Sequence, residues 1–288
     1  MNGLFVGLTT LDLIYLTSEL PKTNQKIVAL DQTIAAGGPA TNAAVTFSYL
    51  KNQATVAGIL GKHPLNQLIL SDLDTYSVNF ADLEPHRIES PAVSSIFVLE
   101  ETGERSVISV NARQTQATPK QLPHDILQGI DLVLIDGHQM AVSYAIASQA
   151  KIAGIPVVVD GGSWKNGFET ILPLADYVIC SANFFPPQCR TQTDVFQYLS
   201  SLSIPFIAIT QGNQPILYQI EEKLEQININ PIQAVDTLGA GDIFHGAFCY
   251  YILKQNFVEA LLSASKIATK SCLSFGTRQW MQLKETED

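Results

Sequence analysis

Charged side chains are scarce in this chain, and basic ones are the scarcer kind. Asp and Glu number 27 against 17 Lys and Arg, for a formal net charge of −10, and charged residues make up only 15% of the 288. A surface with this balance repels a phosphate backbone, so the composition argues against nucleic acid or an anionic membrane as a partner. A small phosphorylated ligand is not excluded, because its site needs only local positive potential.

Paired cysteines and long apolar runs are also lacking. The four cysteines show no C-x-x-C pair and no metal-ligand spacing, which favours small buried hydrophobes in a reducing compartment over a disulfide framework or zinc site. No apolar run is long enough to cross a bilayer, and the first 20 residues contain no Lys or Arg, unlike a signal peptide. We therefore expect a cytoplasmic, soluble protein.

Short apolar runs alternate with amphipathic helical stretches, such as 141–153 and 195–202, along most of the chain. The runs are continuous rather than alternating, as expected for strands covered on both faces. This order predicts an α/β fold with a mostly parallel sheet, whose ligands bind at the carboxyl ends of the strands. Strands are expected at residues 4–7, 55–59, 132–135, 156–159, 177–180 and 206–209.

Two segments depart from this alternation. Residues 13–34 carry β-branched and apolar side chains on both sides of a Pro-Lys-Thr-Asn turn, and residues 93–112 alternate around a hairpin turn at Glu101–Glu104. We interpret these segments as a small β-sheet that stands off the main body as a lid. The chain, 1–288, is then a single domain with a lid built from about 13–34 and 93–112.

The stretch Asp-Thr-Leu-Gly-Ala-Gly-Asp, from Asp236 to Asp242, leads directly into a helical pattern. A Gly-Ala-Gly turn at a helix N-terminus presents backbone N–H groups and the positive end of the helix dipole to an anion such as a phosphate. A carboxylate at Asp242 can be a simple helix N-terminal residue, but glycines beside it lower stability unless a close approach is needed. The stretch predicts phosphoryl transfer to an alcohol, with Asp242 as the general base.

A second glycine turn precedes a helix near the start of the chain, in the stretch Gly-Gly-Pro-Ala-Thr-Asn-Ala-Ala from Gly37 to Ala44. On its own such a turn is usually a tight connection. Asn42 in the first helical turn can both donate and accept hydrogen bonds toward a polyol. Asp12, after the first strand, is a carboxylate that could equally be solvated.

Together, these two stretches resemble the N- and C-terminal signatures of the PfkB, or ribokinase-like, carbohydrate kinases. They occur in the order of that family, separated by most of the chain, and the strand–helix alternation between them also fits. The resemblance therefore covers essentially the whole chain. It implies a three-layer ribokinase-like fold with a small β lid, and the activity of an ATP-dependent carbohydrate kinase.

The resemblance also implies roles for individual residues. Asp242 matches the catalytic base, and Asp236 matches a position that shapes the loop or a monovalent cation site. The anion hole would be formed by Gly239, Ala240 and Gly241. Sugar contacts would come from Asp12, Gly38, Asn42 and His138. Asp136 lies beside His138 in the sequence, and the alternative for His138 is an ordinary histidine at the end of a strand. Nucleotide contacts would come from Thr210, Gly212 and Gly276, in the segments 210–212 and 275–278. Arg278, in the second segment, is more simply interpreted as a surface arginine.

The chain departs from the family pattern in its metal-binding motif. Many relatives have Asn-x-x-Glu after the strand that ends near Cys180, but here Asn183 is followed by Phe-Phe-Pro, so the Glu is absent. The family implies ATP and Mg²⁺ as cofactors and leaves K⁺ open. The metal ligands are left unknown, with Asn183 as one candidate and water and ATP oxygens as the alternative.

The acceptor is open within the family. A phosphate or sulfonate on the sugar would require an Arg or Lys clamp. Lys26 and Arg113 are the candidates for this clamp, and by default they are solvated surface charges. We therefore expect an uncharged ketose, or another pentose or hexose. The alternatives are a nucleoside kinase of the same family and a non-catalytic, ligand-binding relative.

A small sheet that projects from the body leaves strand edges and one apolar face uncovered. Relatives in the family often pair lid to lid, so the resemblance implies a homodimer through the lid.

Overall fold

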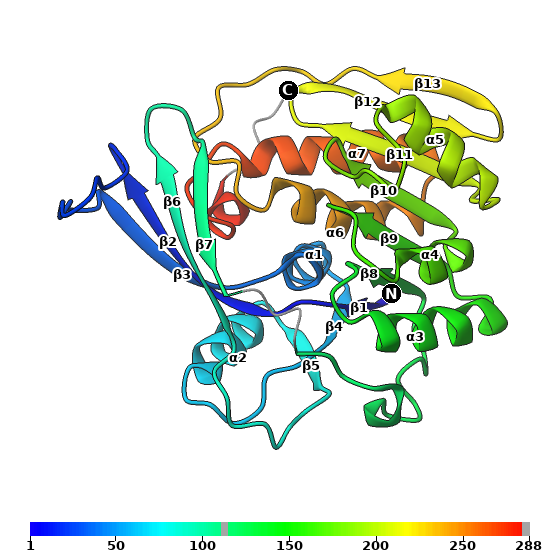
Figure 1. The fold of residues 1–288 in the computed structure, drawn as a ribbon, viewed down its shortest axis with the longest axis horizontal. Coiled ribbons are helices and arrows are strands. Elements are labelled where there is room, and N and C mark those ends of the chain that lie inside the picture. Colours follow the sequence, from blue (N-terminus) through cyan, green and yellow to red (C-terminus); the bar gives the residue numbers. More distant parts are fainter. Residues whose placement is uncertain (111–114, 284–288) are drawn as a thin grey trace.

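The computed structural model describes residues 1–110 and 115–283, and its main body is a nine-stranded sheet (Figure 1). The strands from β11 to β5 in that sheet run parallel, and β12 and β13 extend one edge in antiparallel pairing. The strands in spatial order are β13 (Lys223–Ile227), β12 (Gln214–Ile220), β11 (Phe206–Gln211), β10 (Tyr177–Ser181), β9 (Val157–Gly161), β8 (Leu132–Ile135), β1 (Asn2–Val6), β4 (Gln53–Gly58) and β5 (Val78–Asp82). The six strands predicted for this sheet are confirmed.

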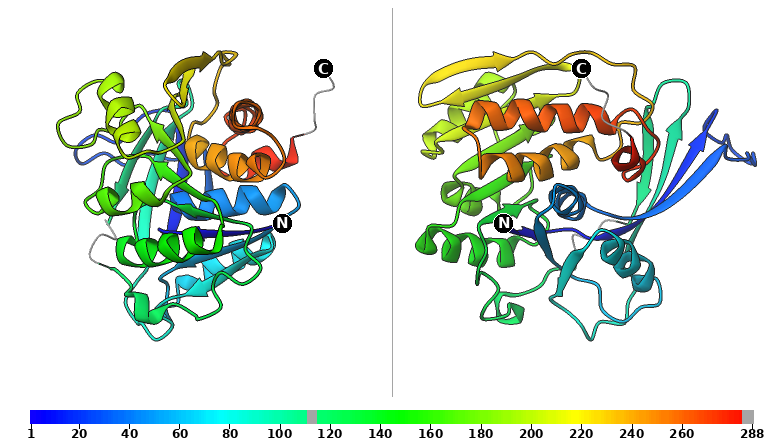
Figure 2. Two further views of the ribbon diagram at one scale, coloured as in Figure 1. Left: turned by 90° about the vertical axis from the view of Figure 1, so that its right-hand side faces the viewer. Right: turned by 180° about the vertical axis from the view of Figure 1, so that it is seen from behind.

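Helices cover both faces of the sheet, which gives three layers (Figures 1 and 2). One side carries α1 (Pro39–Tyr49), α2 (Asn66–Thr75), α6 (Ala240–Ile252) and α7 (Phe257–Ser271). The other side carries α3 (Met140–Ala153), α4 (Phe168–Ile171) and α5 (Gln192–Ser201). Short 3₁₀ turns lie at Pro119–Gln121, Leu172–Leu174 and Gln279–Gln282. In the described part of the chain, no helix combines the length and apolar character that crossing a membrane requires.

Each parallel strand supplies two hydrophobic cores, which explains the continuous apolar runs. In β1, Phe5 belongs to the core under α1, α6 and α7, whereas Leu4 and Val6 belong to the core under α3 and α5, and all three are fully buried. Alternate side chains point to opposite faces of a strand, so a strand with helices on both sides needs apolar residues at every position. The four cysteines are free thiols, with Cys180 and Cys249 buried.

A separate four-stranded sheet stands beside the main body, at the left of Figure 1. Its order is β3 (Asp31–Gly37), β2 (Thr10–Thr17), β6 (Ala92–Leu99) and β7 (Arg105–Ser109), in which β2 and β6 are parallel and the outer pairs antiparallel. It contains the strands and the hairpin predicted from the alternating segments. The predicted end of the second lid segment, at about residue 112, lies outside the described residues.

The two faces of the four-stranded sheet differ. Ile14 and Ile96 are registered neighbours on the inner face, where they pack with Phe275 from the loop after α7. The outer face carries Ile34 and Ile108, which are 47% and 70% exposed. The inner face therefore contacts the main body. The outer face packs into the main core at its base, around Leu11 and Leu13, and is exposed at Ile34 and Ile108.

Candidate active site

The first turns of α1 and α6 meet where the two signature stretches begin their helices. A Cβ on Gly246 would collide with the carbonyl oxygen of Ala43, so the two helix backbones approach as closely as only a glycine permits. This approach brings Asn42 Nδ2 to 2.8 Å from Asp242 Oδ2, to which it donates a hydrogen bond. Two residues that the sequence proposed separately are therefore in direct contact.

Asp242 is a half-buried carboxyl whose surroundings disfavour ionisation. Burial raises the pKa of Asp242 to about 7, and the nearby Asp160 carboxylate acts in the same direction. The hydrogen bond from Asn42 and the positive charges of His245 and Arg105 oppose this rise. A carboxylate that titrates near neutral pH is suited to accept a proton from a substrate hydroxyl.

The Gly-Ala-Gly turn supplies backbone donors beside this carboxylate. Gly239 has a φ of 69° as the residue before α6, and a side chain there would press on Thr277. Within the described residues, the amides of Gly241 and Asp242 donate no hydrogen bond to the protein. They lie at the positive end of the α6 dipole, so the turn can bind an anion.

Asp236 holds this turn from behind. Its Oδ1 accepts a hydrogen bond from Leu238 N at 2.8 Å, and its Oδ2 accepts one from Gly276 N at 2.8 Å. Asp236 is 3% exposed, and burial raises its pKa although both amide bonds lower it. The carboxylate therefore ties the loop before α6 to the loop after α7, and this geometry supports the loop-shaping alternative for Asp236.

Arg278 is a buried part of the site, so the expectation of a surface arginine is wrong. It is 9% exposed, donates to Asn42 Oδ1 at 2.9 Å and forms an ion pair with Asp72 Oδ2 at 3.1 Å. Its Nη2 also donates to the carbonyl of Ala36. Arg278 thus fixes the amide of Asn42, whose nitrogen is then turned toward Asp242.

Asp12 and Gly38 lie together at the base of the four-stranded sheet. Asp12 is 6% exposed on the inner face, where it accepts a hydrogen bond from Thr10 Oγ1 at 2.7 Å, and burial raises its pKa. Gly37 packs directly against this carboxylate, and Gly38 follows with a φ of 100°. Asp12 is therefore held at the start of α1, on the same side as Asn42.

His138 lies at the end of β8, and its neighbour Asp136 is fully occupied by backbone amides. Asp136 accepts hydrogen bonds from Leu8 N, Ala40 N and His138 N at 2.8, 3.2 and 2.9 Å. Burial would raise the pKa of Asp136, but the charge of His138 and these bonds outweigh it and lower the pKa. Asp136 is a buried clamp between β8, β1 and α1, and His138 is half-buried beside it.

The predicted nucleotide residues occupy two separate loops. Thr210 and Gly212 follow one another at the end of β11, where Thr210 Oγ1 donates to Cys180 O and Gly212 is exposed with a φ of 63°. Gly276 lies in the loop after α7 and is joined to the turn through Asp236. Asp236 thus links Gly276 to the turn before Asp242, whereas Thr210 and Gly212 make no such contact among the described residues.

The candidate metal ligand, Asn183, and the candidate anion clamp Lys26 are both exposed. Asn183 lies in the loop after β10. Across residues 1–110 and 115–283, no group of three or more His, Cys, Asp and Glu side chains is placed to hold an ion. Of the two proposed anion clamps, Lys26 is exposed in the β2–β3 connection and Arg113 lies outside the described residues.

Several residues near the site were missed by the sequence reasoning. Asp160, at the end of β9, and His245, on α6, are buried close to Asp242. Arg105, on β7, donates from Nη1 to Thr237 O and Oγ1 at 3.2 and 2.9 Å. Arg105 is registered with the buried Val98, so the period-two alternation of the hairpin could have placed it on the inner face.

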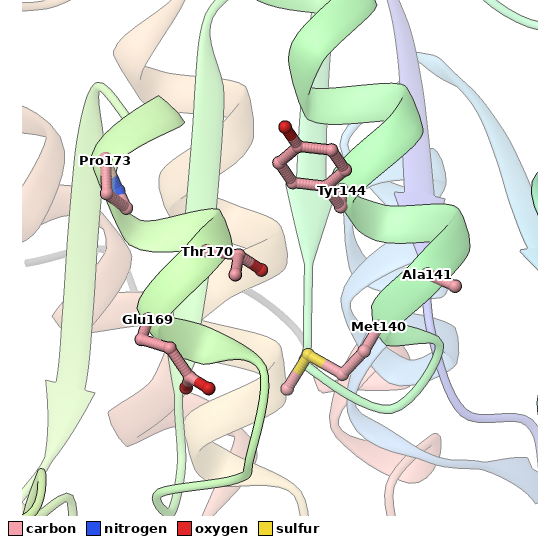
Figure 3. A pocket seen from close by; sticks show the side chains of 6 residues that line it. All are labelled: Met140, Ala141, Tyr144, Glu169, Thr170 and Pro173. Carbon is pink, nitrogen blue, oxygen red and sulfur yellow. The ribbon is translucent and has the colours of Figure 1, made fainter.

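Two hollows differ in their relation to this cluster. A shallow groove of about 530 Å³ between α3 and the α4 region is lined by Met140, Tyr144, Glu169 and their neighbours, and none of the predicted site residues belongs to it (Figure 3). A cavity of about 160 Å³ opens at the end of β1, lined by Leu8, Thr9, Arg87 and Gln139 among others. The second lies beside Gly38, whose Cα approaches Leu8 O, so it adjoins the candidate site.

Comparison with known proteins places the chain in a family. Residues 3–283 match the pfkB family carbohydrate kinases. The chain belongs to this family. A ribokinase from Bacillus subtilis (strain 168) is 25% identical to it, over 97% of this pfkB chain and 96% of that protein.

Solved structures show the same fold. A ribokinase from Giardia lamblia superposes with a TM-score of 0.79 at 19% identity and covers 98% of each chain. A ribokinase from Arabidopsis thaliana, solved with ribose and ATP, gives a TM-score of 0.73 at 20% identity and covers 98% of this chain and 99% of its own. The three-layer ribokinase-like fold predicted for this pfkB protein is confirmed.

Proposed function

We propose that this pfkB protein is an ATP-dependent kinase that phosphorylates a hydroxyl group of an uncharged sugar. The observation that carries the proposal is the Asp242 carboxyl at the positive end of α6. It lies beside the amides of Gly241 and Asp242, which have no hydrogen-bond partner among the described residues. A base next to an anion site is what phosphoryl transfer to an alcohol requires.

In the proposed reaction, Asp242 takes the proton of the acceptor hydroxyl, and the oxygen of that hydroxyl attacks the γ-phosphorus of ATP. The new O–P bond forms as the bond to the oxygen of ADP breaks, and the proton on Asp242 is later lost to solvent. The amides of Gly241 and Asp242 stabilise the charge on the transferring group. Mg²⁺ would neutralise phosphate charge, with Asn183 as one candidate ligand and ATP oxygens and water as the alternative.

Asp12, Gly38 and Asn42 would hold the sugar hydroxyls. Asn42 is already oriented by Arg278, so its amide is fixed before the acceptor binds. Asp12 faces the same region from the inner face of the four-stranded sheet, and His138 would contact the sugar from the end of β8. That sheet would act as a lid that excludes water from ATP.

The cavity at the end of β1 supports a neutral acceptor. Arg87, the basic side chain among the described residues of its lining, forms ion pairs with Glu84 and Glu89 at 4.0 and 3.6 Å. Its Nη1 donates to the carbonyls of Glu89 and Ser90. The carboxylates of Glu84 and Glu89 offset the positive potential of the guanidinium, so Arg87 would bind a phosphate or sulfonate only weakly. We therefore propose a free ketose, pentose or hexose as the acceptor.

The decisive experiment measures acceptor-stimulated ADP release across free sugars, sugar phosphates and nucleosides. We expect a free sugar to give the highest kcat/KM, and Asp242→Asn to abolish transfer while ATP binding persists. A preference for nucleosides would contradict the sugar-kinase proposal and support the nucleoside-kinase alternative. Substantial turnover by Asp242→Asn would refute the base assignment, and no stimulation by any acceptor would favour a non-catalytic protein.

A further inference from the structure

His245 on α6 has a hydrogen-bond acceptor opposite each ring nitrogen. Its Nδ1 lies 2.7 Å from the carbonyl oxygen of Gly241, and its Nε2 lies 3.2 Å from the carbonyl oxygen of Ile179 on β10. The residue is 3% exposed, so water does not replace either partner. Both contacts are with carbonyl oxygens, which accept hydrogen bonds and cannot donate them.

This arrangement favours one protonation state of the ring. A neutral imidazole carries one N–H, so one of its nitrogens would direct a lone pair at a carbonyl oxygen. Both contacts are favourable only when both nitrogens are protonated and the ring is a cation. A buried cation needs a counter-charge, and Asp160 Oδ2 lies 3.7 Å from His245 Nδ1 with Asp160 only 5% exposed.

Within the described residues, His245 is the ion-pair partner of Asp160. The thiols of Cys180 and Cys249 near this carboxylate stay neutral, because burial and the charge of Asp160 raise their pKa well above its ordinary value. The histidine is therefore the side chain placed to supply a positive charge beside Asp160.

We propose that His245 and Asp160 form a buried ion pair that positions the catalytic base and balances the charge beside it. His245 bonds the carbonyl of Gly241, the residue directly before Asp242, and joins it to β10, while Asp160 joins the pair to β9. The ion pair follows from the geometry alone; its effect on turnover rests on the proposed kinase function.

The pair is one of several polar groups around Asp242. Asn42 donates to it from α1, Asp160 faces it from β9, His245 from α6 and Arg105 from β7. Loss of the histidine charge leaves Asp160 unbalanced, which makes ionisation of Asp242 harder. When Asp160 is also replaced, this effect on the ionisation of Asp242 disappears. The histidine holds its second proton only beside the carboxylate, so without Asp160 there is no histidine charge to lose.

The first test reads the charge of His245 directly. NMR of protein labelled with ¹⁵N-histidine, with the signal assigned through His245→Asn, is expected to show two protonated ring nitrogens at pH 7. The same spectrum of Asp160→Asn is expected to show a neutral ring. One unprotonated nitrogen in the wild-type protein at pH 7 would overturn the proposal, whether or not the protein is a kinase.

The second test is the pH profile of kcat/KM in a double-mutant cycle. His245→Asn is expected to shift the acidic limb upward by about one pH unit, the size typical of losing one nearby charge. In the Asp160→Asn background, the same substitution is expected to leave the limb in place. Equal shifts in both backgrounds would contradict the pair. If the wild-type protein phosphorylates no acceptor, the proposed function fails and the NMR result decides on the ion pair.

Discussion

At the scale of single residues, the site combines features that oppose stability. Asp242 is a carboxyl in surroundings that disfavour its charge, with Asp160 as a second carboxylate nearby. Such an arrangement is retained where a base must work near neutral pH, and its cost falls on the folded state. The cost should therefore be measurable in the protein without ligands.

We predict that Asp242→Asn stabilises the unliganded protein at high pH. The pKa of about 7 in the fold is above the ordinary 3.8. The contribution of this carboxyl to the stability of the fold is therefore fully present below pH 3.8 and is lost as the pH rises through 7. At pH 8 the variant should melt roughly 5 °C above the wild type, and at pH 4 the two should nearly coincide. Calorimetry at both pH values tests this, and an equal difference at pH 4 would contradict it.

Substitutions at Gly241 and Gly239 can distinguish the chemical role of the turn from its structural role. A Cβ on Gly241 would have no atom within 4 Å, whereas Gly239 has a positive φ and a crowded neighbour in Thr277. We predict that Gly241→Ala melts like the wild type but loses turnover on the order of 10²-fold, because the methyl obstructs a phosphoryl group at the amides. Gly239→Ala, the matched control, should lower the melting temperature. Wild-type kcat in Gly241→Ala would argue against an anion at this place.

At the scale of elements, the hairpin between β6 and β7 contacts the loop that precedes the anion-binding turn. Arg105 donates to Thr237, and Thr237 Oγ1 donates in turn to Gly103 O at 3.3 Å. The four-stranded sheet is therefore attached to the loop whose turn would carry the phosphoryl group. Closure of the proposed lid and placement of this loop should be coupled.

We predict that Arg105→Gln raises the KM for the acceptor and increases ATP hydrolysis without acceptor, because the hairpin no longer holds the loop and water enters. Arg190→Gln, at an exposed arginine before α5, is the control and should change neither. Steady-state assays with and without acceptor give both values. An unchanged ratio of transfer to hydrolysis would show that the hairpin does not gate water.

The elements that sequence predicts well are those set by local pattern. All of the parallel strands except β5, together with the β6–β7 hairpin, follow from apolar runs and turn residues, so their positions could be found. Strands β5, β12 and β13 were not predicted. In β5 only Val78 is buried, and β13 is mostly exposed with a polar pattern. The parallel pairing of β2 with β6 was also beyond reach, because it joins segments far apart in the chain.

Within the candidate site, signature residues were found and their supporting partners were not. The glycine turns indicated Asn42 and Asp242, and the structure joins them. Arg278 resembled a surface residue because its partners, Asp72 and Ala36, are distant in sequence. His245 lies within an apolar helix pattern, where nothing local reveals that both ring nitrogens meet carbonyl oxygens. Such contacts depend on tertiary packing.

At the scale of the whole molecule, the outer face of the four-stranded sheet is exposed on its two outer strands, at Ile34 and Ile108. Ile34, Leu13, Ser95 and Ile108 are registered neighbours across its four strands, and Tyr15 stacks on Phe97 in the next row. An apolar face of this kind supports the proposed homodimer through the lid.

We predict that Ile108→Glu converts a dimer to a monomer in size-exclusion chromatography with light scattering, because a buried charge would oppose the contact. Ile152→Glu, at a residue of α3 that is 89% exposed, should leave the mass unchanged. A wild-type monomer at micromolar concentration would refute the dimer, and a dimer that withstands Ile108→Glu would place its interface elsewhere.

The hydrogen bond between Asn42 and Asp242 spans 200 residues of the chain. During synthesis, the segment with the sugar-binding candidates is complete long before the base emerges from the ribosome. A nascent or prematurely terminated chain therefore contains only half of the proposed site, and we expect it to transfer no phosphoryl group. Competence for phosphoryl transfer arises only when the last part of the polypeptide packs against the first, so activity reports directly on completed folding.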